Sequence, residues 1–376
     1  MKLTVTIARY ITGLLFIFSG LVKAIDPLGL AYKMQEFFEA WANAGFIKGL
    51  METMGEQALA FSIGMITLEV VVGMAIILGW QKKIMSWILF LLILFFTFLT
   101  SYVLFSGKIK ACGCFGDCIP LTPIQTFTKD IILLILAIIL LLNQKYILPV
   151  ARQTILLSIM LLAIIATLFL QFYVMKHLPL ADCLAYKKGN NILELRKMPP
   201  NAIPDKYMIS FVYSKNGKSE AFSSENLPDS SWEFVERKQI LVAEGKYNTP
   251  LINDFSLITF SGNDTTEAIL SNAGDYYILF VKDLDGLPEG FKRDQQLAIA
   301  AADTGIQFYV VTARREMVGN RYAALVSKGD KIDMTILTCD ATAIKTAARA
   351  DMVLYKMNAA TVIDKWGWAD FDKVNF

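Results

Sequence analysis

Long apolar runs without charge fill the first half of this chain. Residues 84–107 and 153–175 contain no charged side chain, and each run exceeds the ~20 residues that a helix needs to cross a bilayer. The bilayer core has no water to hydrogen-bond backbone N–H and C=O groups, so a single spanning segment must form these hydrogen bonds within itself. Such runs therefore fold as helices. Three further runs are nearly as apolar, namely 4–24, 58–80 and 131–147. Buried helices of a large soluble core are the alternative, but five such segments favour a membrane protein with five spans.

Five spans place the two ends of the chain on opposite sides of the membrane. The links 81–83 and 143–152 carry basic residues and no acidic ones, which the positive-inside rule assigns to the cytoplasm. The first run is preceded by Lys2 and resembles a signal peptide in composition, but no small-x-small cleavage site follows, so we expect a retained helix. We therefore predict that loop 112–118 and everything after Met175 lie outside the cytoplasm.

Three of the five cysteines, Cys112, Cys114 and Cys118, fall within seven residues between two spans. Cysteines this close on a short loop can form, break or exchange disulfides with little loss of chain entropy. A bond between Cys112 and Cys114 would be strained, so Cys118 is the better resolving partner for either. A fixed disulfide that staples the loop is the alternative, and Cys183 is a further partner. No metal is predicted, because three thiolates lack a nearby fourth ligand.

Charged residues inside the spans indicate a second candidate site. Glu69 lies near the middle of its span, where an ionised carboxylate costs a few kcal/mol unless it is paired or protonated. Arg9 and Lys23 are candidate partners, because they are fourteen residues apart and share one helix face. The functional interpretation is a polar pocket for a quinone head group or a proton step. The alternative is a buried ion pair that fixes helix packing.

The composition of the chain, and the motifs that its sequence lacks, indicate which kinds of molecule it binds. The net charge is +2 and no basic run is present, so nucleic acid is not expected as a partner. No phosphate-binding glycine loop, zinc-binding histidine pair or nucleophile elbow is found. The lipid bilayer is the partner that the sequence indicates most directly. Residues 30–41 place apolar side chains about one turn apart, which predicts an amphipathic helix on the outer membrane surface.

The chain changes character at 177–179 and then has the pattern of a soluble region. Runs 206–215 and 218–223 flank Asn216-Gly217, which predicts a β-hairpin, and 231–243 is a third strand. From residue 276 strands and helices alternate, which predicts an α/β sandwich. The expected strands are 276–281, 306–312, 333–337, 352–355 and 361–363, and the expected helices are 288–304, 316–327 and 341–349. The expected domains are 1–150 (membrane domain), 151–176 (fifth helix), 177–255 (β-rich connector) and 256–376 (α/β domain).

The first 145 residues contain a set of recognisable elements, namely Arg9, Gly13, Phe18-Ser19-Gly20, Lys23 and Asp26-Pro27, then Glu69, Gly73 and Leu78-Gly79, then Cys112-Gly113-Cys114-Phe115-Gly116. In these elements the segment resembles the DoxX-like and MauE family of redox-associated membrane proteins. The resemblance implies a bacterial inner-membrane protein whose C-terminal domain is periplasmic. It also implies a role in maturation of an extracytoplasmic protein, because MauE members are linked to maturation of methylamine dehydrogenase.

The C-terminal half is similar to the thioredoxin-like domain appended to DoxX proteins in Bacteroidota. The match lies in Cys339-Asp340, Ile344-Lys345-Thr346, Arg349, Leu354-Tyr355 and Trp366. The Cys-x-x-Cys that should follow strand 276–281 is missing, since 282–288 contains no cysteine, and Ala350-Asp351 replaces the proline before the penultimate strand. In thiol–disulfide exchange a cysteine thiolate must attack the disulfide, and no other side chain at this position can replace it. We therefore expect this domain to be a binding or docking module.

Together these features predict a four-helix DoxX-like membrane bundle with a fifth spanning helix, followed by a soluble α/β thioredoxin-like domain with a β-rich lead-in. The predicted function is membrane redox support, in which the loop cysteines pass electrons or disulfides to an extracytoplasmic client or a partner thioredoxin. The alternative is a non-catalytic membrane anchor or assembly factor whose thioredoxin-like domain is an interaction surface.

Overall fold

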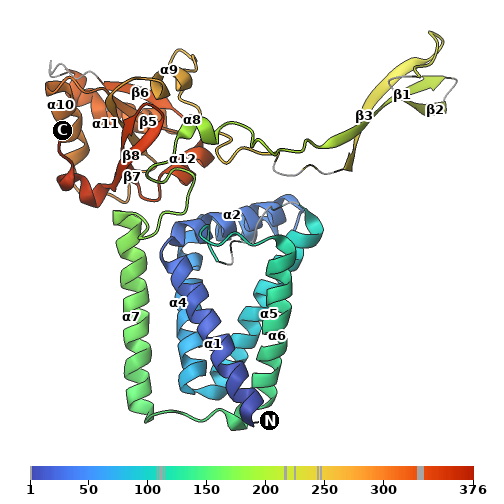
Figure 1. Ribbon diagram of the computed structural model, residues 1–376, viewed down its shortest axis with the longest axis vertical. Coiled ribbons are helices and arrows are strands. Elements are labelled where there is room, and N and C mark those ends of the chain that lie inside the picture. The colour runs from blue at the N-terminus through green and yellow to red at the C-terminus, as the bar shows by residue number, and fades with distance from the viewer. Residues whose placement is uncertain are drawn as a thin grey trace.

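The computed structural model describes residues 2–107, 109, 113, 115–215, 218–223, 226–243, 245, 248–327 and 334–376. A helical bundle and an α/β domain are its two bodies, and a long three-stranded sheet extends sideways from the α/β domain (Figure 1). Among these residues five helices are long and apolar enough to cross a membrane, which confirms the five predicted spans: α1 (Lys2–Ala24), α4 (Ala58–Leu78), α5 (Lys82–Ser106), α6 (Pro123–Leu142) and α7 (Gln153–His177).

Local sequence explains where these helices begin and end. Helix α6 starts eight residues before the apolar block at 131, because Thr122 and Gln125 form a reciprocal capping box. Helix α4 ends at Gly79, whose φ of 72° is readily adopted only by glycine. The short 3₁₀ turn η1 (Gln144–Tyr146) follows α6 and leads into the link before α7.

Small residues bring α1 and α4 into close contact. A Cβ on Gly13 would lie 2.9 Å from the carbonyl oxygen of Gly73, and a Cβ on Gly73 would lie 2.8 Å from that of Gly13. The two backbones can touch only because both positions lack a side chain, as is typical of helix pairs in membranes. Either glycine replaced by a larger residue would force α1 and α4 apart.

Two further helices cover the end of the bundle that faces the α/β domain. Helix α2 (Pro27–Asn43) lies across this end, roughly perpendicular to the spans (Figure 1). It buries Leu30, Met34 and Phe38 against the bundle, which confirms the predicted amphipathic helix. Helix α3 (Lys48–Glu56) was not predicted, because it is only nine residues long and has few apolar side chains, of which Met51 alone is buried.

The α/β domain is built on a five-stranded mixed sheet in the order β6-β5-β4-β7-β8. The strands are β4 (Asp275–Val281), β5 (Phe308–Thr312), β6 (Met334–Thr338), β7 (Met352–Asn358) and β8 (Thr361–Gly367). Strands β4, β5 and β6 are parallel, whereas β7 pairs with both β4 and β8 in antiparallel fashion. The predicted α/β fold class is confirmed.

Helices connect the parallel strands. They are α10 (Arg293–Asp303), α11 (Arg315–Ser327) and α12 (Ala341–Ala347), with the terminal 3₁₀ helix η2 (Trp368–Lys373). Helix α10 begins five residues later than predicted, because 284–291 forms turns that include Gly290 with φ of 73°. The core of this domain also contains Leu178, Ile192 and Phe255, so chain from the predicted connector packs into it. The short helices α8 (Ile192–Leu195) and α9 (Thr266–Leu270) belong to these flanking segments.

The predicted hairpin and third strand form a separate antiparallel sheet in the order β2-β1-β3. Its strands are β1 (Lys206–Lys215), β2 (Lys218–Ser223) and β3 (Glu233–Ala243), and the predicted turn at 216–217 lies outside the described residues. The ring of Tyr213 packs against the rings of Phe234 and Phe222, with centroid distances of 5.6 Å and 5.9 Å. The described part of this sheet buries only Val212, so it is held by strand pairing and these aromatic contacts.

Candidate functional site

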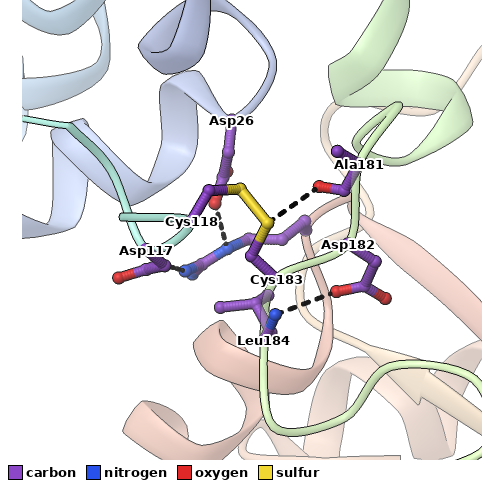
Figure 2. Close-up of a disulfide and its surroundings, with 8 residues drawn as sticks. Asp26, Asp117, Cys118, Ala181, Asp182, Cys183 and Leu184 are labelled. Carbon is purple, nitrogen blue, oxygen red and sulfur yellow. Dashed lines mark hydrogen bonds and ion pairs between the residues drawn. A yellow bond between two sulfur atoms is a disulfide. The ribbon is translucent and has the colours of Figure 1, made fainter. Parts of the chain in front are cut away.

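A disulfide joins the two bodies of the molecule. Cys118, in the loop before α6, is bonded to Cys183, just after α7, and their Cα atoms are 4.9 Å apart (Figure 2). Cys183 is exposed and Cys118 is half-buried, so solvent reaches the bond. Cys112 and Cys114 lie outside the described residues. In this structure Cys118 is therefore bonded to Cys183, the further partner considered above, and not to either neighbour in the loop.

An aspartate precedes each cysteine of the disulfide, and each aspartate pairs with a cation of the α/β domain. Arg349 Nη2 lies 2.9 Å from Asp117 Oδ2, and Lys365 forms an ion pair with Asp182. The same arginine uses Nε to reach Asp26 Oδ2 at 2.9 Å. Figure 2 shows Asp26 and Asp117 beside the disulfide, with Asp182 on its other side. Ion pairs therefore surround the covalent link.

Burial makes the Arg349 contacts electrostatically important. The side chain of Arg349 is only 7% exposed, and burial alone would lower its pKa, but the carboxylates of Asp26 and Asp117 outweigh burial and raise it. The same burial raises the pKa of Asp26, although Arg349 acts against this change. Asp26 also caps α2 by accepting a hydrogen bond from the backbone N–H of Gly29. One carboxylate thus fixes both the start of α2 and the position of the α/β domain.

Lys365 is the second buried cation at this junction. Burial lowers its pKa, and the neighbouring Asp182 carboxylate partly compensates. Its Nζ also donates to the carbonyl oxygen of Tyr186 at 3.4 Å. Neither Lys365 nor the ionic partners of Arg349 were predicted from sequence. The pattern Asp-Cys, present at both Asp117-Cys118 and Asp182-Cys183, was the available signal.

The charged residues of the spans divide into two separate sets. Lys23 Nζ lies 2.6 Å and 2.7 Å from the two carboxylate oxygens of Glu69, and both side chains are almost fully buried. Ser19 Oγ donates to the same carboxylate at 3.4 Å. Arg9 instead donates to the carbonyl oxygens of Ile76 and Ile77 at 2.7 Å and 2.5 Å, so it satisfies the C-terminal end of α4. Of the two candidate bases, the structure pairs Glu69 with Lys23.

Sequence reasoning missed a second buried carboxylate, Asp130. It accepts a hydrogen bond from Thr100 Oγ1 at 3.1 Å and pairs with Lys129 at 2.8 Å. Lys129 also lies over the ring of Phe115, 4.8 Å from its centroid, and Phe115 belongs to the cysteine loop. The capping motif at Thr122 was the sequence signal that could have revealed it. This motif starts the helix before Asp130, whereas the apolar block alone starts after it.

A small cavity of about 20 Å³ lies between Glu69 and Asp130, beneath Phe115. A single water molecule needs roughly 10–15 Å³ measured in this way, so the cavity has the size of one water. A quinone ring does not fit in it. The arrangement therefore suits a proton step between two carboxyl groups and does not suit a quinone head group.

The loops of the α/β domain contain no sulfur where a thioredoxin would have it. After β4, Lys282 donates its backbone N–H to the carbonyl oxygen of Asp351, and its ammonium lies 3.6 Å from the Asp351 carboxylate. Arg314 pairs with Asp283 at the same distance. Cys339 is buried at the end of β6, and burial raises the pKa of its thiol to about 11. A thiol with this pKa is a poor nucleophile near neutral pH.

The fold and this site define a multi-pass membrane protein with an appended α/β domain. Residues 1–143 match the model of a family described as methylamine utilisation protein MauE, so the membrane part is MauE-like. Residues 207–244, which form the three-stranded sheet, match a domain of unknown function, DUF8463. No curated protein and no solved structure matches this chain.

Proposed function

We propose that this protein is the membrane component of an extracytoplasmic disulfide system, with a MauE-like role in the maturation of a client protein. The observation that carries the proposal is the disulfide Cys118–Cys183, in which Cys183 is exposed and Cys118 belongs to the same short stretch of sequence as Cys112 and Cys114. Cys112 and Cys114, close to Cys118 in sequence, can supply a second dithiol pair to which the disulfide is passed. The methylamine-utilisation family of residues 1–143 supports a maturation role.

The proposed thiol–disulfide exchange conserves electrons and protons. A client thiolate attacks Sγ of the exposed Cys183 and releases Cys118 as a thiolate, and a second client thiolate then releases Cys183. The client has lost two electrons and two protons and gained a disulfide, while Cys118 and Cys183 have become thiols. A disulfide between Cys112 and Cys114, or one carried by a partner thioredoxin, takes up the same two electrons and restores the first bond.

The buried carboxyl groups provide the accompanying proton transfer. Glu69 and Asp130 line a cavity of one-water size directly beneath Phe115, which follows Cys114 in sequence. A carboxylate can accept a proton through a single bridging water. We therefore assign Glu69 and Asp130 to a proton step, with Lys23 as the ion-pair partner of Glu69. Arg9 has a structural role in this scheme.

The α/β domain serves as a docking module for the client or the partner thioredoxin. Its mixed sheet, with parallel β4 and β5 beside antiparallel β7 and β8, is compatible with a thioredoxin-like fold. The segment after β4 lacks cysteine, so the domain contributes position and not chemistry. We place this domain and the cysteine loop on the periplasmic side of a bacterial inner membrane, because an accessible disulfide persists in an oxidising compartment.

A trapping experiment tests the relay. Cys118→Ser leaves Cys183 as a free exposed thiol, which attacks the disulfide of the oxidised partner thioredoxin and expels one of its two cysteines as a thiolate. Because Cys118 is no longer there to release the partner, the mixed disulfide should accumulate and migrate as a larger species on a non-reducing gel. Cys339→Ser is the matched control, because it removes a buried thiol without freeing an exposed one. Absence of any reducible adduct with Cys118→Ser, Cys183→Ser and Cys114→Ser alike would contradict the relay.

A second candidate function is a non-catalytic anchor in which the disulfide only staples the two bodies. The ion pairs of Arg349 and Lys365 around the bond favour it, since they hold the same interface without sulfur chemistry. Alkylation gel-shift in cells grown with and without oxidant separates the two. A mixed population that shifts with oxidant supports the relay, whereas a permanently oxidised, unreactive pair supports the staple.

Orientation has its own test. Alkaline phosphatase fused after Phe376 should be active, because the proposed topology places this end outside the cytoplasm. A reporter that requires the cytoplasm should be inactive at the same point. The reverse result would overturn both the orientation and the oxidising environment that the disulfide chemistry needs.

A further inference from the structure

A cavity of about 570 Å³ separates the α/β domain from the end of the bundle that carries α2. From the bundle side it is lined by α2, by the junction between α3 and α4, and by the last turns of α7. From the other side it is lined by the loops that follow β4 and β5, the segment before β7 and the start of α12. Its volume lies within the ~300–1,000 Å³ typical of ligand sites.

The topology of the sheet makes this position a favourable one for a ligand. In open α/β sheets ligands bind outside the carboxyl ends of the parallel strands. Here the carboxyl ends of β4 at Val281 and β5 at Thr312 point toward the cavity, since Lys282 and Ala313 lie in or next to its lining. The edge of the sheet best suited to hold a ligand therefore faces the membrane surface.

The side of the cavity formed by the bundle contains a set of apolar side chains beside its polar ones. Leu28, Leu59, Phe172 and Met175 line it, and Leu59 and Phe172 belong to the spanning helices α4 and α7. Phe172 is 50% exposed and Leu59 is 37% exposed. These exposed apolar side chains continue the cavity toward the lipid-facing surface. These side chains offer an acyl chain an apolar surface that leads from the cavity toward the bilayer.

The lining of the cavity as a whole has one more positive than negative side chain. Lys282 and Arg314 are balanced by Asp351 and Asp283. Lys176 and Lys345 lie over aromatic rings, with Nζ 5.9 Å from the centroid of Trp368 and 5.4 Å from that of Tyr32, and Lys345 Nζ also donates to the neutral Gln35 Oε1 at 3.2 Å. Within the residues that the structure describes, neither lysine forms an ion pair. Glu56 is the remaining acidic side chain of the lining, so the two lysines exceed it by one positive charge.

We propose that this cavity binds the phosphate head group of an anionic phospholipid from the adjacent leaflet. Lys176 and Lys345 hold the phosphate, and one acyl chain extends along Leu59 and Phe172. Lysines near a membrane surface attract anionic lipid with about 1 kcal/mol each. A zwitterionic lipid would place its own ammonium group beside these lysines, so an anionic head group is favoured. The bound lipid would fill the space between the two bodies and hold them at a fixed distance.

The test uses the full-length, disulfide-bonded protein in nanodiscs of phosphatidylcholine, with or without phosphatidylglycerol. Native mass spectrometry after release should show retained phosphatidylglycerol on the wild type, and the lipid should raise its Tm. The double variant Lys176→Gln/Lys345→Gln should retain on the order of tenfold less. Lys48→Gln/Lys197→Gln is the matched control, since these two lysines are exposed and lie outside the cavity. It should retain as much lipid as the wild type.

Further measurements test whether the cavity binds the phosphate group of a lipid or free inorganic phosphate. Phe172→Ala should weaken lipid retention but leave any effect of inorganic phosphate in detergent unchanged. Stabilisation of the wild type by inorganic phosphate as strong as that by phosphatidylglycerol would overturn the lipid assignment. Equal retention of both lipids by the wild type would also overturn it, and this comparison requires no variant. Equal retention by the wild type and the double lysine variant would exclude these lysines as the phosphate ligands.

Discussion

The membrane bundle and the α/β domain both contain buried ion pairs, but the surroundings of the pairs differ. In the α/β domain Asp294 pairs with Arg321 at 2.6 Å and accepts a hydrogen bond from Tyr322 at 2.7 Å, which fastens α10 to α11. In the bundle the Lys23–Glu69 pair lies beside a water-sized cavity beneath the cysteine loop. The first arrangement is saturated with partners and serves packing, whereas the second leaves room for a proton to move.

The difference separates scaffold from chemistry. The central strand β4 is buried from Tyr276 to Val281, so it builds a sheet core and offers no reactive group. The cysteines and buried carboxyl groups to which the proposed function assigns the chemistry belong to the bundle, to its loop before α6 and to the junction. The α/β domain contributes Arg349 and Lys365 to that junction, and these residues act by holding it in place.

Reversal of the charge at Glu69 should have the largest effect. Glu69→Lys places two ammonium groups together in the bundle, and breaking a buried pair costs about 3–5 kcal/mol. We expect loss of the protein from the membrane fraction, measured by immunoblot. Glu69→Gln should still accumulate but lose redox activity.

The exchanged pair Lys23→Glu/Glu69→Lys is the control for this variant, since it restores opposite charges and should recover accumulation. Normal levels of Glu69→Lys alone would show that the pair is not needed for folding. Full activity of Glu69→Gln would assign the residue to packing and would remove the contrast with Asp294.

Replacement of Arg349 should loosen the junction. Arg349→Gln leaves Asp26 buried without its cation, a change that costs about 3–5 kcal/mol when the carboxylate stays charged. Because burial already raises the pKa of Asp26, we expect the variant to take up a proton at a higher pH than the wild type does. Limited proteolysis after reduction of the disulfide should cleave the variant between the two bodies faster than the wild type.

Arg237→Gln is the matched control for Arg349→Gln, because this arginine lies in the extended sheet, far along the chain from the junction. It should leave proteolysis unchanged. Equal resistance of reduced wild type and reduced Arg349→Gln would show that the ion pairs do not hold the two bodies together.

Cys339 should make the stability of the α/β domain depend on alkaline pH. Its thiol has a pKa near 11 in the folded protein against 9.0 as the reference, so between these values the unfolded state releases a proton that the folded state keeps. Stability should fall as pH rises from about 9 to 11, by on the order of 2 kcal/mol. Cys339→Ala should show a smaller decrease, measured by denaturant unfolding at pH 8 and pH 10.5. Parallel pH profiles for both proteins would contradict this assignment.

We expect the smallest effect for the isolated soluble fragment, which should have no disulfide reductase activity. Residues 178–376 alone should fold, because they contain the whole buried sheet, but should not reduce insulin disulfides. Cys183 and Cys339 are the only thiols in this fragment, and Cys339 is buried. In the full protein Cys114→Ser should abolish the redox phenotype, whereas Cys339→Ser should affect only stability. Cysteine-dependent insulin reduction by the fragment would move the chemistry into the α/β domain.

Local pattern was sufficient for the elements. The uncharged runs predicted the spans, because burial in lipid is a property of each segment alone. Strands β1, β2 and β4 were predicted within one residue at each end, and the turn dipeptide and the β-branched and aromatic runs explain why. Helix α3 was missed because it is only nine residues long and has few apolar side chains, and Asp130 was missed because the apolar block was taken to start after it.

The sequence by itself therefore determined a five-span membrane protein with an α/β domain and a cluster of cysteines between two spans. Only the tertiary structure decided which partners meet. Arg349 reaches Asp117 and Asp26 across 232 and 323 residues, and Cys118 bonds to Cys183 across 65. Hydrophobic periodicity specifies how each segment folds and which face it buries. Pairing between distant charges and thiols depends on how the segments pack, and no local pattern records it.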